Sequence, residues 1–416
     1  MRYHDRCFCR NVFCPNRLQN LVANLQNGNE DVTPLSPLPS EARSAEIVDG
    51  VFELARDIGW LRKPNMGYRP KRDDVQVLAN IVQQYGLRGG ELVVGTIAPL
   101  NGGNAARRVL STVSTINNLE AAAYVETKPF EELTAIDPHE RLRFEIPGGS
   151  PSMRVVDLLT PIGLGQRGLI AAPPRSGKTI LLQQIAAGIS ANHPDIYMMV
   201  LLIDERPEEV THMQRTVHGE VVASCNDHDA TAHVRLAKFV IQRAKRLVEC
   251  KQNVVILLDS LTRLGRAFNT EVRGGGKIMS GGIDSRALAE PKAIFGAARK
   301  VEHGGSLTII ASALIETGSR MDEVIFNEFK GTGNMEIMLS RDLSNKRIWP
   351  AIDLHLSGTR KEEKLLSARE LPVAHMIRRR LQADSPARGM EMLLENLAKY
   401  PTNAAMVEHL APKPTK

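Results

Sequence analysis

Apolar runs and amphipathic segments alternate along the chain from about residue 153 onward. The runs span 197–204, 254–259, 307–314 and 335–339, and helical spacing of apolar residues is clear in 231–250 and 286–301. A strand that is apolar at successive positions is buried on both faces, which is typical of a parallel sheet between two layers of helices. We therefore predict an α/β domain over 153–416, mostly parallel, with a helical C-terminal end at 362–410.

The preceding part of the chain has the pattern of short strands. These segments are broken by Gly, Pro, Asn and Asp and lie at 48–54, 59–62, 75–78 and 92–98. Several short strands in so small a span favour a closed barrel of the OB or cold-shock type over a sandwich. We place this barrel at 45–120. A connector over 121–152, with a Pro/Gly-rich loop, leads into the α/β domain.

Residues 1–44 differ again in composition. His4, Cys7, Cys9 and Cys14 cluster there, ahead of a stretch rich in Pro, Ser and Asn. Four such side chains could ligate zinc, but the spacing is tight and no second half-site follows. We favour a disordered leader, or a wrongly assigned start codon.

Length and composition exclude several classes. The 416 residues suggest two to three domains, at about 150 residues each. No apolar run approaches the roughly 18–20 residues that span a bilayer. The N-terminus lacks the apolar core of a signal peptide, and the five cysteines do not form the pattern of a disulfide framework. We therefore expect a cytoplasmic protein without a membrane partner.

One segment has the layout of a phosphate-binding loop. A short apolar strand runs through Ala172 into Ser-Gly-Lys-Thr at the start of a helix. Backbone N–H groups there can cradle phosphates, Lys178 adds a positive charge, and the Thr179 hydroxyl can bind Mg²⁺. Ala172 stands where the usual pattern has Gly; a chance turn would leave the Gly-Lys-Thr at this junction unexplained. The expected ATP-binding residues are Pro173, Pro174, Arg175, Ser176, Gly177, Lys178, Thr179 and Ile180.

Two apolar strands end in carboxylates. Beside a phosphate-binding loop, Asp259 is interpreted as the acid on the Mg²⁺ side; the alternative is an Asp cap on a buried strand. The strand that ends at Asp204 is followed by Glu205, which could act as general base on the attacking water. An acidic helix N-terminus from Glu205 to Glu209 explains the same residues, and the sequence leaves these two readings open.

Three Gly-containing segments carry cations among small residues: 273–283, 316–320 and 357–361. The first two are loops that can place a cation on a nucleic-acid backbone, although ordinary exposed turns have the same composition. Arg360 in the third segment is a candidate arginine finger that acts across a subunit interface, with a surface arginine as the alternative.

Together these motifs resemble the bacterial transcription termination factor Rho family. The segments that carry the resemblance are 172–179, 200–211, 219–224, 257–263, 295–299, 304–310, 328–336 and 357–363, within a match over about residues 45–400. The resemblance implies a RecA-like ATPase core in a homohexameric ring. It further implies movement 5′-to-3′ on single-stranded RNA, driven by ATP with Mg²⁺, and release of the transcript from RNA polymerase.

The resemblance also assigns roles by position. Lys178 and Thr179 would hold phosphate and Mg²⁺, Glu205 would be the catalytic base and Asp259 the acid on the metal side. At the subunit interface, the resemblance implies that Arg360 is the arginine finger on a neighbour's γ-phosphate and that Arg347 is a second arginine. It implies that the ring of Trp349 stacks on the adenine. On the loops around the RNA channel it implies Lys277, Ile278, Gly281 and Arg320, the last in place of a lysine, with Glu328 and Lys330 in a subunit-contact segment.

The barrel departs from the family pattern. Barrels of this family stack pyrimidine bases on aromatic rings. This chain has Ile58 and Trp60 where the family has two phenylalanines, and Gln76 where it has a tyrosine. We expect Trp60, Arg62 and Asp74 to contact RNA, with weaker binding or a relaxed preference for cytosine.

Two other functions remain as alternatives. A rotary-type ATPase subunit would share the core, but Trp60, Arg62 and the cationic loops argue against it. An RNA-binding module with an inactive nucleotide site is disfavoured by the intact Lys178, Glu205 and Asp259. We expect an RNA-dependent ATPase and RNA helicase that terminates transcription.

Overall fold

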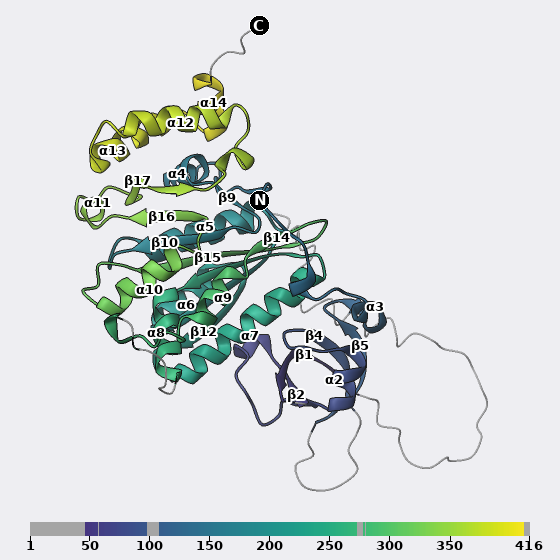
Figure 1. Ribbon diagram of the computed structural model, residues 1–416. Helices are drawn as coiled ribbons and strands as arrows, with labels where there is room; N and C mark the ends of the chain where they lie inside the picture. The colour runs from purple at the N-terminus through teal and green to yellow at the C-terminus, as the bar shows by residue number, and fades with distance from the viewer. Residues whose placement is uncertain (1–45, 57, 98–107, 273–277, 279, 412–416) are drawn as a thin grey trace, which may run out of the picture. The chain divides into compact units, whose positions relative to one another are not determined.

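The computed structural model describes residues 46–56, 58–97, 108–272, 278 and 280–411 (Figure 1). These residues belong to one compact unit that begins at Ala45. The predicted leader with Cys7, Cys9 and Cys14, and Lys277 of the first Gly-rich loop, lie outside the described residues.

Six strands within 46–97 and 108–120 form an antiparallel sheet in the order β3-β2-β1-β4-β5-β6. They are β1 (Glu46–Ala55), β2 (Ile58–Arg62), β3 (Val75–Val77), β4 (Leu92–Ile97), β5 (Leu110–Ile116) and β6 (Leu119–Glu120). The backbone N–H of Gln76 donates to the carbonyl of Arg108, 2.8 Å away, which joins β3 to the start of β5 and closes the sheet. Phe52, Leu61 and Val93 fill its interior. The predicted small barrel is confirmed, with α2 (Ala79–Tyr85) between β3 and β4.

The connector contributes to both domains: its first helix packs into the interior of the barrel through Ala121 and Tyr124, and its strand at 135–136 joins the α/β domain. Its elements are α3 (Ala121–Val125), η2 (Phe130–Glu132), β7 (Ala135–Ile136), β8 (Arg141–Leu142) and the start of α4 (Pro151–Leu159). β7 pairs with β14 (Arg299–Val301), which in turn pairs with β15 (Ser306–Leu314). The helix expected over 286–301 is therefore shorter, α9 (Ala289–Gly296), because Arg299 and Lys300 pair with Leu307 and Ser306 in a hairpin.

The main path of the large sheet, in the part of the chain that the structure describes, has the order β12-β11-β13-β15-β10-β16-β17. The further strands are β10 (Arg167–Ala172), β11 (Tyr197–Glu205), β12 (Glu220–Cys225), β13 (Asn253–Asp259), β16 (Met335–Leu339) and β17 (Ile352–Thr359). Neighbours along this path are parallel except β16 and β17. β8 pairs apart from it with β9 (Ile162–Gly163). The prediction of a mostly parallel sheet is confirmed.

Helices cover both faces of this sheet because alternate strand residues point to opposite sides. Leu169 packs in one hydrophobic cluster and Ile170 in the other. The first cluster includes α7 (Ala230–Glu249), α8 (Leu261–Glu271), α9 and α10 (Arg320–Lys330); the second includes α4, α5 (Lys178–Asn192), α6 (Pro207–Thr216), α12 (Glu370–Leu381), α13 (Pro386–Leu397) and α14 (Asn403–Leu410).

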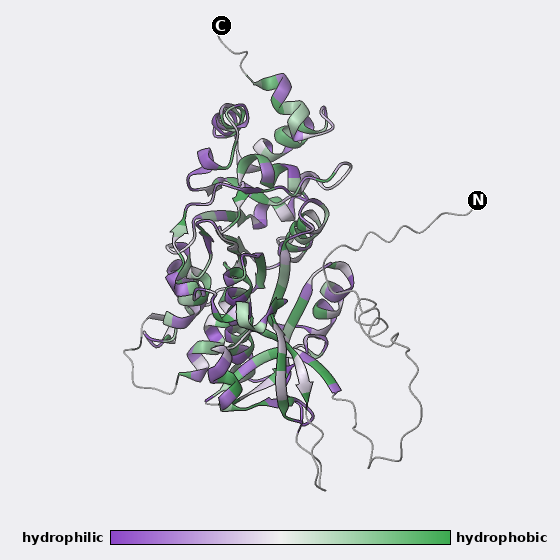
Figure 2. Cartoon of the chain, turned by 90° about the vertical axis from the view of Figure 1, so that its right-hand side faces the viewer, coloured by the Kyte–Doolittle hydropathy of each residue, from purple (hydrophilic) through white to green (hydrophobic). Residues whose placement is uncertain are grey.

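Hydropathy follows this layering. Figure 2 shows hydrophobic colour concentrated along the strands, whereas the surrounding helices mix both kinds of residue. Figure 1 shows α12, α13 and α14 beyond β17, where the expected helical end lies. Among the described residues, no helix is both long enough and apolar enough to cross a membrane.

Candidate functional site

The loop between β10 and α5 has the geometry that phosphate binding requires. Arg175 and Gly177 have φ angles of 67° and 86°, a left-handed backbone that turns successive N–H groups toward one side. The Ser176 hydroxyl donates to the carbonyl of Pro173 at 2.7 Å and holds the turn closed. Lys178 then begins α5, so the loop ends at a helix N-terminus that favours an anion.

Three charged side chains meet at the carboxyl edge of the sheet. The Lys178 amine forms ion pairs with Asp259, at the end of β13, and with Glu205, at the end of β11, where the Nζ–Oε1 distance is 3.4 Å. Both carboxylates are buried. Burial opposes the charge on Lys178, but Asp259 and Glu205 outweigh it and raise the pKa of the amine. Burial raises the pKa of Glu205 to about 7, with Lys178 opposing this shift.

Two further residues hold this cluster in place, and neither was among the expected site residues. Arg263 on α8 donates to the backbone carbonyl and the carboxylate of Asp204, at 2.5 and 2.8 Å. The Ser312 hydroxyl on β15 donates to Asp259 at 2.7 Å. Arg263 could have been found from its position one helical turn after the end of the Asp259 strand. Ser312 is one of two small polar residues within the apolar run 307–314 and gives no such signal.

Trp349 lies beside the phosphate-binding loop. A Cβ added to Gly177 would come within 2.6 Å of the Trp349 Cζ3 atom. The indole is 42% exposed and Ile180 is 58% exposed, so apolar surface is available next to the loop. Arg347, with a φ of 60°, is exposed two residues before the ring. The expected adenine-stacking residue is therefore next to the expected phosphate loop.

Arg360 lies near the end of the sheet where β10 begins, away from the phosphate-binding loop at the end of β10. β17 is antiparallel to β16, so Thr359 pairs with Met335, and Met335 pairs with Gly168 near the start of β10. Lys178 follows the other end of β10, roughly 20 Å away at about 3.3 Å per residue. Arg360 is exposed and cannot reach the phosphate loop of its own chain. Arg360 is also separated from Arg347, which lies at the same end of the sheet as the phosphate-binding loop.

The described parts of the two expected channel loops are adjacent. Gly281 has a φ of 78°, and an added Cβ there would lie 2.9 Å from the carbonyl oxygen of Arg320 at the start of α10. The side chain of Ile278 is 75% exposed, and Arg320 is exposed as well. The first loop thus lies against the start of α10 at Gly281.

Three expected RNA contacts lie together on one face of the barrel. Trp60 is the cross-strand neighbour of Glu53 and of Gln76. The guanidinium carbon of Arg62 lies 5.9 Å from the centroid of the Trp60 ring, and Arg62 forms an ion pair with Asp74. Gln76 is only 8% exposed, so it offers no stacking surface.

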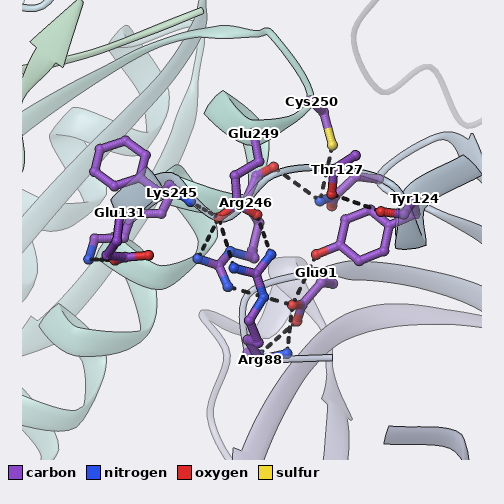
Figure 3. Close-up of polar contacts among 12 residues, drawn as sticks. Arg88, Glu91, Tyr124, Thr127, Glu131, Lys245, Arg246, Glu249 and Cys250 are labelled. Carbon is purple, nitrogen blue, oxygen red and sulfur yellow. Dashed lines mark hydrogen bonds and ion pairs between the residues drawn. The ribbon is translucent and has the colours of Figure 1, made fainter. Parts of the chain in front are cut away.

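A buried ion-pair cluster joins the barrel to α7 (Figure 3). Arg88, in the loop before β4, donates to both oxygens of Glu249, at 3.2 and 2.7 Å. Arg246 and the backbone N–H of Phe130 also contact Glu249, at 2.8 and 2.7 Å. The Glu249 side chain is fully buried. The barrel is therefore attached to α7 of the α/β domain through charge-assisted contacts between Arg88 and Glu249.

Comparisons with known proteins agree with both halves of this description. Residues 48–122 match the family model described as Rho termination factor, RNA-binding domain, and residues 152–359 match that of the ATP synthase alpha/beta family, nucleotide-binding domain. An ATPase of the type III secretion system of pathogenic bacteria superposes with a TM-score of 0.54 at 22% identity, covering 74% of this chain and 86% of that chain. That likeness is one of fold.

Two relatives cover most of the chain. Transcription termination factor Rho of Cereibacter sphaeroides is 51% identical over 369 residues, which are 87% of this chain and 86% of the relative. The protein of the same name from Pseudomonas fluorescens biotype C is 48% identical over 388 residues, 92% of each chain. An RNA-binding barrel and an ATP-hydrolysing core thus occur in one chain, as the sequence predicted. The chain belongs to the transcription termination factor Rho family.

Proposed function

We propose that this chain is an RNA-dependent ATPase and RNA helicase that works as a homohexameric ring. It moves 5′-to-3′ on single-stranded RNA and releases the transcript from RNA polymerase. The observation that carries the proposal is the separation of Arg360 from Lys178, Glu205 and Asp259 across the sheet. A site that contains all four residues needs two chains, and a closed ring gives every chain such a neighbour.

The residues of one site would divide the work of phosphoryl transfer. Lys178 offers its ammonium group to the β- and γ-phosphates, and Glu205 orients a water molecule and accepts its proton. Arg360 of a neighbour stabilises the charge that develops on the γ-phosphoryl oxygens. Arg347 lies near the same loop, and Trp349 stacks on the adenine.

The donor set also fits Mg²⁺. The Thr179 hydroxyl and the Asp259 carboxylate are the hard oxygen ligands that this cation prefers, and Ser312 orients the carboxylate from behind. When bound, Mg²⁺ would neutralise charge on the phosphates. Asp259 would then exchange part of its ion pair with Lys178 for the metal.

Two surfaces would contact RNA. On the barrel, Trp60 stacks on a base while Arg62 and Asp74 form hydrogen bonds with it. In the channel, Lys277 and Arg320 contact the phosphate backbone, with Ile278 and Gly281 beside them. ATP hydrolysis would move these loops and thereby the RNA.

The first test is steady-state ATP hydrolysis without RNA and with cytosine-rich or purine-rich single strands. Stimulation by cytosine-rich RNA alone supports the proposal and means that Trp60 and Arg62 suffice for base choice. Equal stimulation by both supports the motor and means that the altered barrel has lost its preference. An ATPase rate that neither strand changes would overturn RNA-dependent catalysis.

A second test asks whether the finger acts between chains. Arg360→Ala should bind ATP normally but hydrolyse it about 10³- to 10⁵-fold more slowly, and Lys178→Ala should be inactive through loss of phosphate binding. Rings assembled from a mixture of the two variants contain some sites with an intact loop and an intact neighbouring Arg360, so partial activity should return. Normal hydrolysis by Arg360→Ala alone would refute the finger assignment.

A further inference from the structure

The carboxylate of Glu53 lies between two guanidinium groups from different parts of the chain. Arg62 of β2 approaches it from within the barrel, with Nε 2.5 Å from Oε2. Arg235 of α7 approaches from the ATPase core, with Nε 2.6 Å from Oε1 and a terminal nitrogen 2.8 Å from Oε2. Arg235 also donates to the carbonyl of Tyr68 at 2.9 Å. Arg235 of the core thus forms an ion pair with Glu53 of the barrel.

The positive and negative charges around Glu53 are equal in number. Arg62 forms a second ion pair with Asp74, so two cations, Arg62 and Arg235, face two carboxylates, Glu53 and Asp74. The Arg62, Glu53 and Asp74 side chains are 9%, 14% and 5% exposed, and groups so far removed from water need compensating partners. Burial opposes the charge on Glu53, but Arg235 and Arg62 outweigh it and lower the pKa of this carboxyl.

This balanced group includes two of the proposed RNA contacts, Arg62 and Asp74, and adjoins the third, Trp60. Glu53 is the cross-strand neighbour of Trp60, and Arg62 lies 5.9 Å from the indole centroid. RNA brings a negative phosphate chain to that face, so each uncompensated carboxylate there weakens binding. If Arg235 were neutral, Arg62 alone would face two carboxylates and the group would carry a net negative charge.

We propose that Arg235, on helix α7 of the ATPase core, is a positioning residue for RNA binding by the barrel. It supplies the second positive charge of this group, so that Glu53 and Asp74 leave no net negative charge on the face that RNA approaches. The inference rests on the proposed role of Trp60 and Arg62 in RNA binding. It makes the RNA affinity of the barrel depend on a core helix.

The experiment measures binding of a labelled cytosine-rich single-stranded RNA to the full chain without nucleotide at low salt. Arg235→Gln should raise Kd about 3- to 10-fold, the effect of one unit charge a few ångströms from the ligand. Arg235→Lys keeps the charge and should stay close to the unaltered protein. Lys238→Gln is the matched control: it removes a cation from the same helix, but Lys238 pairs with Glu290 of the core, at 2.6 Å.

A double variant separates the proposed role from a direct phosphate contact. Arg235→Gln combined with Glu53→Gln removes one charge of each sign, so the affinity should return to within about 2-fold of the unaltered protein. A direct contact would give no such recovery, and the slope of log Kd against log salt would fall by about 0.7. Melting temperatures of all variants check that the barrel remains folded.

Two results would overturn the inference: unaltered RNA affinity in Arg235→Gln, or a double variant that binds no better than the single one. RNA stimulation of ATP hydrolysis, measured in parallel on the unaltered chain, tests the proposed function separately. If RNA does not stimulate hydrolysis but the Kd values follow the predicted pattern, the proposed RNA-dependent ATPase is refuted and the role of Arg235 stands. If RNA stimulates hydrolysis but Arg235→Gln leaves Kd unchanged, the role of Arg235 is refuted and the proposed ATPase stands.

Discussion

The indole of Trp349 lies against the backbone of Gly177, and a Cβ at that glycine would come within 2.6 Å of the ring. The two residues are far apart in sequence, yet the contact brings the aromatic ring to the turn just before Lys178. Gly177 also has a φ of 86°, which L side chains rarely adopt. Two constraints therefore favour glycine at this position: the left-handed backbone conformation and the close contact with the Trp349 ring.

Gly177→Ala should reduce ATP affinity more than tenfold. The left-handed backbone costs an alanine about 1–2 kcal/mol, and relief of the clash must displace Trp349 or the loop. Equilibrium titration with ATP measures the effect. The control is Gly67→Ala, because Gly67 has a φ of 59° with no atom within 4 Å of an added Cβ; it introduces strain alone and should leave ATP binding unchanged. Equal ATP affinity in both variants would refute the role of the contact.

Trp60→Ala should weaken binding of cytosine-rich RNA by roughly 5- to 150-fold, since one stacked base contributes about 1–3 kcal/mol. The loss should be severe because Ile58 and the buried Gln76 offer no second ring. Ile58→Phe adds a ring two residues before Trp60 on the same face and should strengthen binding. Fluorescence anisotropy measures both. If Ile58→Phe binds no better than the unaltered chain, stacking at this position is not what limits affinity.

Glu249→Ala should destabilise the protein by about 3–5 kcal/mol, because it leaves buried guanidinium groups without their carboxylate. Glu249 pairs with Arg88 and Arg246 (Figure 3), and its side chain is fully buried. Glu131→Ala is the matched control: it removes an ion pair with Lys245 at a side chain that is 61% exposed, a change worth less than about 1 kcal/mol. Denaturant unfolding measures the free energy of unfolding of both variants. A similar loss of stability in the two would contradict the stabilising role of the buried Glu249 cluster.

ATP hydrolysis should fall as the pH drops below about 7. Burial raises the pKa of Glu205 to about 7, so the carboxylate becomes protonated at a higher pH than an ordinary glutamate. A protonated Glu205 cannot accept the proton of the attacking water, and kcat/KM, which reports the free enzyme, should drop about tenfold per pH unit on the acidic side. A profile that stays level down to pH 5 would mean that Glu205 is not the base.

Local patterns in the sequence were sufficient for much of the fold. Continuous apolar runs become the buried strands β11, β13 and β15 because a strand covered on both faces must be apolar at successive positions. The segment at 286–301 shows the limit of such patterns. Its helical spacing predicted one helix, but pairing of Arg299 and Lys300 with β15 made the last part a strand, a choice that depends on the hairpin partner and not on the spacing of apolar residues within the segment.

The sequence by itself determined the phosphate-binding turn and the carboxylates at strand ends, because both depend on a few consecutive residues. Only the tertiary structure decided which distant groups meet. It puts Arg360 across the sheet from Lys178 because β17 runs antiparallel to β16. It also joins Glu53 to Arg235, 182 residues later in the chain. Such pairings follow from strand order and helix packing, and no local spacing of residues encodes them.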